Sequence, residues 1–234
     1  MRVACATSSM ASYFKAHFPE MGVIENVDRV PEDLDLLILT GGEDISPSRY
    51  RAEPDGSYGI NLDRDEKEFS ILDRALILNP SLKVLGVCRG HQLINIFFGG
   101  SLIQDIGSHP GIHPLKFRDD ADHPLKWLTM VNSMHHQAVN NIGYNGDYSP
   151  DIIAVEPSSG LPEILLWGDQ FLGVQFHPEF FSFEKGDKFF SCIKSWVKRE
   201  ASFLLTRTDR DIRKILIERG ILDFQVIGED TEND

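Results

Sequence analysis

Residues 83–100 read KVLGVCRGHQLINIFFGG, and the rest of the chain is best understood from this stretch. A short apolar run of strand type reaches a glycine-rich point, and a run with helical period then continues to a pair of glycines. Cys88 lies at the joint. At such a joint a side chain projects beyond the carboxyl edge of a sheet, and the helix behind it supplies unpaired N–H groups and partial positive charge. Both favour a thiolate, which is the reactive form of cysteine.

An inert cysteine is the competing interpretation, because most lone cysteines behave as small buried hydrophobic residues. Gly86 and Gly90 favour the reactive interpretation, since a strained strand-to-helix elbow has no room for larger side chains. Cys88 alone does not decide between the two. The decision depends on whether the chain also supplies a base, a group that orients it and donors for an oxyanion.

Composition describes a soluble globular protein. The chain has 234 residues, of which 41% are hydrophobic and 25% charged. Lys and Arg number 23 and Asp and Glu 36, a net charge of −13 that disfavours nucleic acid and anionic membranes as partners. The three cysteines are too few and too scattered for a disulfide framework or a zinc site, so a reducing, cytoplasmic setting is expected. No signal peptide, membrane span or cofactor is expected.

Hydrophobic patterning predicts an α/β fold with a mainly parallel central sheet flanked by helices. Strand-like and helical runs alternate in the first half, and a hairpin at Asp169–Gln170 is predicted in the second. The His- and Pro-rich stretch 108–123 has no clear period and is predicted to be loop. We expect residues 1–200 to form one catalytic domain, and residues 201–234 to add a helical extension with a disordered acidic tail.

A base is predicted at His177, in the sequence GVQFHPE of residues 173–179. Pro178 biases His177 toward extended backbone, and residues two apart in extended chain point to the same side. Glu179 can therefore hold the His177 ring. The alternative is a solvated loop histidine beside a surface glutamate. Residues 41–42, Gly-Gly after a strand-like run, could supply an oxyanion N–H, although such a pair is most often only a turn.

Together these residues resemble the class I glutamine amidotransferases, whose pattern is G-x-C-x-G-x-Q followed far downstream by H-P-E. The resemblance covers about residues 30–197 and implies the flavodoxin-like fold of that family. Further stretches narrow it to the γ-glutamyl hydrolase-like branch, typified by γ-glutamyl-γ-aminobutyrate hydrolases. They are GGEDISPSRY at 41–50, Asp63-Arg64-Asp65 with Glu68, GGSLIQDI at 99–106 and VNSMHHQ at 131–137.

The resemblance implies a role for each matching residue. Cys88 would attack the γ-carbonyl of a γ-glutamyl amide and form a thioester. His177, oriented by Glu179, would protonate the departing amine and then activate water. The oxyanion donors would be the backbone N–H groups of Gly42 and Arg89. The residues implied to bind the glutamyl α-amino and α-carboxylate groups are Gln92, Ser133, His135 and His136.

Two functions remain open on this resemblance. One is a free-standing hydrolase for a small γ-glutamyl-amine or glutamine, and the other is a glutaminase subunit that passes ammonia to a separate synthetase. A complete set of Cys88, His177 and Glu179 argues against a non-catalytic relative. The stretch before Leu34 is short for the branch. The segment after about Ala201 looks like an addition, which suggests a contact with a synthetase partner or within a homodimer.

The remaining polar residues have structural interpretations. One of His135 and His136 could be a structural histidine satisfied by backbone instead of touching substrate. Arg64 and Asp65 at a predicted helix start are interpreted as an ion pair. No metal site is predicted at the proline-preceding histidines of the 108–123 stretch, because no carboxylate or cysteine falls at a ligand spacing that a fold would fix. Those histidines are His109, His113 and His123.

Overall fold

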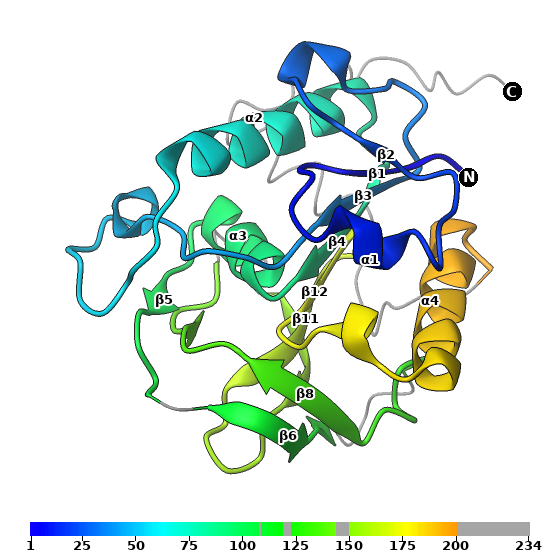
Figure 1. The fold of residues 1–234 in the computed structure, drawn as a ribbon. Helices are drawn as coiled ribbons and strands as arrows, with labels where there is room; N and C mark the ends of the chain where they lie inside the picture. Colours follow the sequence, from blue (N-terminus) through cyan, green and yellow to red (C-terminus); the bar gives the residue numbers. More distant parts are fainter. Residues whose placement is uncertain (108, 119–122, 144–149, 201–234) are drawn as a thin grey trace, which may run out of the picture.

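The computed structural model describes residues 1–107, 109–118, 123–143 and 150–200. Its centre is an eight-stranded sheet with the order β2-β1-β3-β4-β12-β11-β10-β7 (Figure 1). Neighbours from β2 to β12 run parallel, and β11, β10 and β7 continue the sheet antiparallel. The strands are β1 (Val3–Cys5), β2 (Gly22–Val23), β3 (Leu36–Leu39), β4 (Lys83–Val87), β7 (Lys116–Phe117), β10 (Asp151–Val155), β11 (Pro162–Trp167) and β12 (Phe171–Val174).

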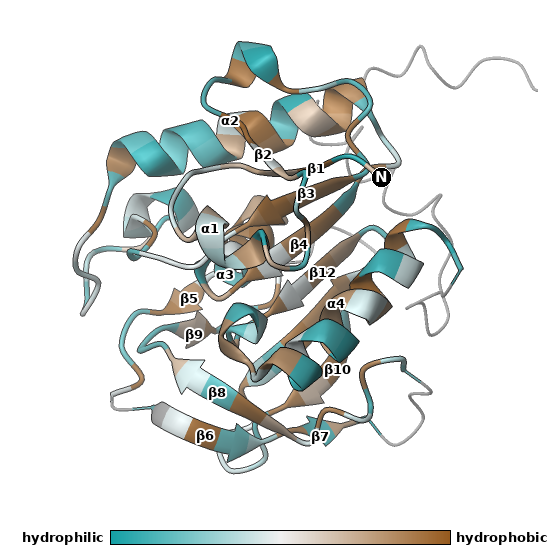
Figure 2. Cartoon of the chain, turned by 45° about the vertical axis from the view of Figure 1, so that its right-hand side comes forward, coloured by the Kyte–Doolittle hydropathy of each residue, from teal (hydrophilic) through white to brown (hydrophobic). Residues whose placement is uncertain are grey.

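Helices cover both faces of this sheet, so the predicted α/β class with a mainly parallel sheet is confirmed. α2 (Leu62–Leu78) and α3 (Arg89–Phe97) pack on one face, and α1 (Ala11–Phe14) and α4 (Phe183–Val197) on the other. Figure 2 shows hydrophobic residues concentrated on the central strands and hydrophilic residues along much of α2 and α4. Short 3₁₀ turns complete the helical structure: η1 (Val27–Arg29), η2 (Pro47–Tyr50) and η3 (Pro178–Phe180).

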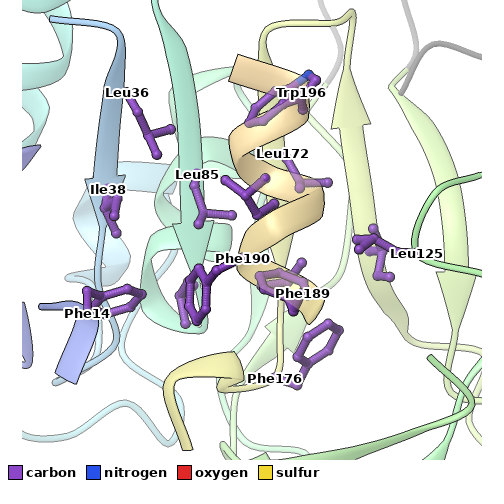
Figure 3. Packing of buried hydrophobic residues seen from close by; sticks show 14 of the residues in the cluster. Phe14, Leu36, Ile38, Leu85, Leu125, Leu172, Phe176, Phe189, Phe190 and Trp196 are labelled. Atoms are coloured by element: carbon purple, nitrogen blue, oxygen red, sulfur yellow. The ribbon is translucent and has the colours of Figure 1, made fainter. Parts of the chain in front are cut away.

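Aromatic residues fix α4 to the sheet. Phe189, Phe190 and Trp196 are fully buried and lie over Leu85 of β4 and Leu172 of β12 (Figure 3). Full burial of one such side chain contributes about 1.5–3 kcal/mol, so this interface anchors the helix firmly. β11 and β12 pair antiparallel on either side of residues 169–170, in agreement with the hairpin predicted there.

Three neighbouring parallel strands end together at one edge of the sheet. Leu39 of β3 lies opposite Gly86 of β4, and Val87 of β4 lies opposite Val174 of β12. The segments that follow these strands therefore emerge side by side. Ligand sites of such sheets lie beyond the carboxyl ends of the strands, and this edge receives every residue of the predicted catalytic set.

Two small antiparallel pairs lie beyond the main sheet, and one of them corrects the sequence interpretation. The stretch 108–123, predicted to be loop, contains β6 (Pro110–Pro114), which pairs with β8 (Met130–Met134), as well as β7. Pro110 and Pro114 occupy the two ends of β6, and the strand that pairs with β6 lies some distance along the chain. Local periodicity therefore gave no sign of a strand here. β5 (Leu102–Ile103) pairs with β9 (Ala138–Val139).

The predicted C-terminal extension, residues 201–234, lies outside the described residues. Within the described part of the chain, none of the helices combines the length and apolar character needed to cross a bilayer.

Candidate active site

Cys88 occupies a sharp elbow between β4 and α3, with φ 51° and ψ −105°. Positive φ is unfavourable for a residue with a side chain and costs on the order of 1–3 kcal/mol. The glycines on either side explain how the turn closes. A Cβ on Gly90 would lie 2.1 Å from the Leu39 carbonyl oxygen, and one on Gly86 would lie 2.5 Å from the Gly90 oxygen. The close packing of α3 on the strands thus requires both glycines.

His177 lies beside Cys88 and is held by Glu179. Its Nδ1 is 2.8 Å from Glu179 Oε1, and the two side chains are 5% and 0% exposed. Burial disfavours the charged ring, but interactions with Cys88 and Glu179 outweigh burial and raise the His177 pKa to about 10. An imidazolium held between a sulfur and a carboxylate is the arrangement that general acid–base chemistry on a cysteine requires.

Asn132 of β8 fixes the backbone of His177, a contact that sequence reasoning missed. The His177 N–H donates to Asn132 Oδ1 at 2.8 Å, and Asn132 Nδ2 donates to the His177 carbonyl at 2.8 Å. The residue lies within the VNSMHHQ stretch, which sequence analysis associated with substrate. Nothing in its local pattern indicated a partner 45 positions away.

The Gly41–Gly42 loop packs directly against this pair. A Cβ on Gly41 would come within 2.7 Å of His177 Cε1, so the loop touches the imidazole. Gly42 has φ 147°, and a Cβ there would lie 1.9 Å from a nitrogen of Arg64. Arg64 Nη2 donates to the Gly41 carbonyl at 2.8 Å, and this hydrogen bond holds the loop in place. The Arg89 N–H lies in the first turn of α3, where helical N–H groups lack partners within the helix.

A largely buried ion network supports the two segments that are predicted to supply oxyanion N–H groups, the Gly41–Gly42 loop and the start of α3. Arg64 pairs with Glu43 and, at 3.1 Å, with Glu68, while the Arg89 guanidinium pairs with Glu68 and Asp65. Arg64 and Asp65 therefore bind other partners instead of each other, which corrects the ion pair expected between them. The network links the helix α2 to the elbow and to the loop after β3. Buried charges of this kind need mutual neutralisation, because each is costly alone.

Of the four predicted substrate residues, His136 contacts the loop after β3, and Gln92 contacts the segment that follows β8. His136 is half-buried, stacks on the exposed Tyr58 with ring centroids 4.3 Å apart, and has Nε2 3.0 Å from the Asp44 carboxylate. Gln92 is buried on α3, and its Nε2 donates to the Gln137 carbonyl at 3.1 Å. His136 retains exposure toward solvent, whereas the Gln92 amide braces the 133–137 segment.

Ser133 and His135 are directed into the protein instead. Ser133 is buried, and its hydroxyl donates to the His109 carbonyl. The His135 side chain is 2% exposed, with Nδ1 2.9 Å from the Gln137 carbonyl. Its Nε2 faces a group that also contains His113 and Glu163.

That group includes two of the three proline-preceding histidines. His109 and His113 meet His135 and Glu163, with one nitrogen or oxygen of each within 4.8 Å of the others. His123 stays apart, and its Nδ1 accepts from the Leu125 N–H at 3.2 Å. The carboxylate of this group comes from β11, far along the chain, so ligand spacing in the sequence could not reveal it.

Comparison with known proteins agrees with this architecture. The Peptidase C26 family model matches residues 9–179. A Schizosaccharomyces pombe protein, PB2B2.05, bearing the provisional name of a glutamine amidotransferase, is 33% identical over 168 residues, which span 64% of this chain and 64% of its own length. The protein YvdE of Lactococcus lactis subsp. lactis, provisionally named glutamine amidotransferase-like, is 32% identical over 66% of this chain and 70% of the relative.

The fold itself has solved counterparts. The crystal structure of a glutamine amidotransferase from Thermotoga maritima superposes with a TM-score of 0.57, at 16% identity, over 94% of this chain and 93% of that chain. The fold is thus that of the class I glutamine amidotransferases, flavodoxin-like with a mostly parallel sheet. The family model matches residues 9–179, and the chain therefore belongs to the Peptidase C26 family of class I glutamine amidotransferase-like proteins.

Proposed function

We propose that this protein is a cysteine-dependent hydrolase that cleaves the γ-glutamyl amide bond of a γ-glutamyl-amine or of glutamine. The observation that carries the proposal is His177, which interacts with Cys88 on one side and with Glu179 at 2.8 Å on the other. The nearby GGEDISPSRY and VNSMHHQ stretches favour the γ-glutamyl-γ-aminobutyrate hydrolase type.

In the proposed reaction the Cys88 thiolate attacks the γ-carbonyl carbon and forms a tetrahedral intermediate. The backbone N–H groups of Gly42 and Arg89 stabilise its oxyanion. The His177 imidazolium then protonates the departing nitrogen, the C–N bond breaks, and a γ-glutamyl thioester remains on Cys88. Neutral His177 next takes a proton from water, which attacks the thioester. The C–S bond then breaks, glutamate leaves, and the Cys88 thiolate is restored beside the His177 imidazolium, which keeps the proton taken from water.

The glutamyl end of the substrate carries an ammonium and a carboxylate. The Asp44 carboxylate lies two residues after Gly42 and contacts His136 at 3.0 Å, so both groups border the proposed oxyanion loop. We assign this pair to recognition of the glutamyl α-substituents, with Asp44 suited to the ammonium and His136 to the carboxylate. Gln92 and Ser133 are buried, and each donates a hydrogen bond to a backbone carbonyl, so we assign them a supporting role beneath this pair.

A substrate screen with the purified chain tests this function. γ-Glutamyl-γ-aminobutyrate, other γ-glutamyl amines and glutamine are supplied separately, and glutamate release is measured. We expect hydrolysis of γ-glutamyl amines by the lone protein, and a mass gain of one glutamyl group on Cys88 in quenched reactions. Cys88→Ala abolishes turnover, whereas Cys192→Ser, on α4 and outside the site, retains it.

The alternative function, a glutaminase subunit that passes ammonia to a separate synthetase, predicts a different pattern. Glutamine would then be the preferred substrate, and its hydrolysis would accelerate when the partner enzyme is added. Unchanged turnover by Cys88→Ala would contradict both functions, because both require the thioester.

A further inference from the structure

A second polar cluster lies apart from Cys88, where the β6–β8 pair meets the main sheet. His109 immediately precedes β6, His113 lies within it, His135 follows β8, and Glu163 lies on β11. The His113 Nε2 lies 3.6 Å from Glu163 Oε1, and the His135 Nε2 lies 3.8 Å from the same oxygen. The His109 ring centroid is 5.0 Å from those of both other histidines. Three separate segments thus direct polar atoms to one point.

The atoms at this point are buried and have no hydrogen-bond partner in the described part of the chain. They are the Nε2 atoms of His109, His113 and His135 and both carboxylate oxygens of Glu163. The Glu163 side chain is 0% exposed. Burial of a carboxylate without a partner costs several kcal/mol or more, and proteins avoid it unless a cation or donors compensate. The described residues therefore supply no counterpart for this carboxylate.

Backbone contacts set the tautomers of two of the histidines. The Nδ1 atoms of His113 and His135 lie 3.1 Å and 2.9 Å from the carbonyl oxygens of Pro114 and Gln137. A carbonyl only accepts, so each Nδ1 carries the hydrogen and each Nε2 keeps a free lone pair. Metal-bound histidines typically show this pattern, with one nitrogen donating to a backbone carbonyl and the other facing the ion.

We propose that His109, His113, His135 and Glu163 bind one structural Zn²⁺ ion. Three imidazole nitrogens and one carboxylate oxygen match the ligand preference of zinc, and four protein ligands complete its tetrahedral shell. With Zn–ligand bonds of about 2.0–2.2 Å, tetrahedral ligands lie roughly 3.3–3.5 Å apart. The separations of 3.6 and 3.8 Å to Glu163 are only a few tenths larger. A closed shell leaves no position for substrate, so the site is structural.

The ion would fasten the β6–β8 pair to the main sheet, beside which it lies as a separate ribbon (Figure 1). β8 also carries Asn132, which fixes the His177 backbone, and leads to His136 near the oxyanion loop. Zinc would thus stabilise one wall of the candidate active site without contacting the reacting atoms. The proposal does not depend on which amide the enzyme cleaves.

Direct metal measurement tests the site. Wild-type protein is stripped with a chelator, reloaded with Zn²⁺ or Co²⁺ and passed through gel filtration, and the metal content and visible spectrum are recorded. We expect one ion per chain and the intense absorption of tetrahedral Co²⁺. Glu163→Gln and His113→Asn should lose the bound ion, whereas His17→Asn, on the other face of the sheet, should retain it. Metal retention by wild type no greater than by Glu163→Gln would overturn the proposal.

Thermal unfolding separates metal binding from a merely structural polar cluster. Zinc should raise the Tm of the wild type and of His17→Asn but not that of Glu163→Gln. Without metal, Glu163→Gln should be at least as stable as wild type, because it no longer buries a carboxyl group without a partner. If Glu163→Gln is destabilised equally with and without zinc, the four residues are a hydrogen-bonded core cluster and the site does not exist.

Discussion

At Cys88, backbone strain and chemistry coincide. The side chain is held at φ 51° and ψ −105°, a region that glycine adopts far more easily, and it is thereby presented beside His177. Cys5, by contrast, sits in the core of β1, where burial raises its pKa to about 12 and keeps the thiol protonated. The two cysteines differ in environment, and only Cys88 combines a helix N-terminus with a nearby base.

Relief of this strain is measurable. We expect Cys88→Gly to be inactive yet more stable than Cys88→Ala by about 1 kcal/mol. Glycine adopts the positive φ without strain, and the relief of strain exceeds the entropy that the more flexible unfolded chain gains. Urea unfolding of the two variants gives the difference. Greater stability of the alanine variant would show that the elbow is not strained.

The elevated His177 pKa predicts a pH-dependent stability. Because the folded pKa of about 10 exceeds the ordinary 6.5, the stabilisation is complete below about pH 6.5 and is lost as pH rises toward 10. Glu179→Gln removes one cause of the shift. Its deficit in unfolding free energy relative to wild type should be largest near pH 6 and should shrink by pH 10. A deficit that stays constant with pH would exclude this linkage.

At the scale of elements, the elbow depends on the close approach of α3 to β3 and β4. A methyl group at Gly90 would lie 2.1 Å from the backbone oxygen of Leu39, and backbone cannot move aside as a side chain can. The positions of Cys88 and of the Arg89 N–H therefore depend on a contact between a helix and a strand that are distant in sequence.

We expect Gly90→Ala to destabilise the protein by about 3 kcal/mol, the upper part of the range for overpacking, and to lower activity together with stability. Gly22→Ala is the matched control, because a Cβ at that position of β2 meets nothing within 4 Å. Denaturant unfolding of both variants decides the point. Equal stabilities would mean that α3 can shift to accept the methyl group.

At the scale of the whole molecule, buried charges connect elements that the chain order separates. Glu68 of α2 binds Arg64 on its own helix and Arg89 at the start of α3. Arg64 also reaches the carbonyl of Gly41 after β3. One carboxylate therefore holds together the helix layer and both segments of the proposed oxyanion site.

Glu68→Gln should cost about 3–5 kcal/mol, because it leaves two buried guanidinium groups without full compensation. Glu66→Gln, on the solvent side of the same helix, removes only the ion pair with Arg49 and should change stability little. Thermal and urea unfolding of the two variants provide the comparison. Similar losses would imply that Glu68 is no more important than a surface charge.

The α/β class, the elbow at Cys88 and the family pattern could be predicted from the sequence, because each depends on residues close together along the chain. Apolar runs, glycine positions and short motifs report local geometry directly. The roles of Gly42, Arg89, Gln92 and Ser133 remain predictions, and His135 and His136 differ in their surroundings although they are adjacent in sequence.

The contacts between distant segments became visible only in the folded protein. Asn132 meets His177, Arg64 binds Glu43 and Glu68 instead of Asp65, and Glu163 joins three histidines from the β6–β8 region. No local period or residue spacing predicts these contacts, because they depend on the order of the strands and on which strand faces pack together. The predicted catalytic residues could therefore be proposed from the sequence, whereas the residues that support them and the proposed zinc ligands required the fold.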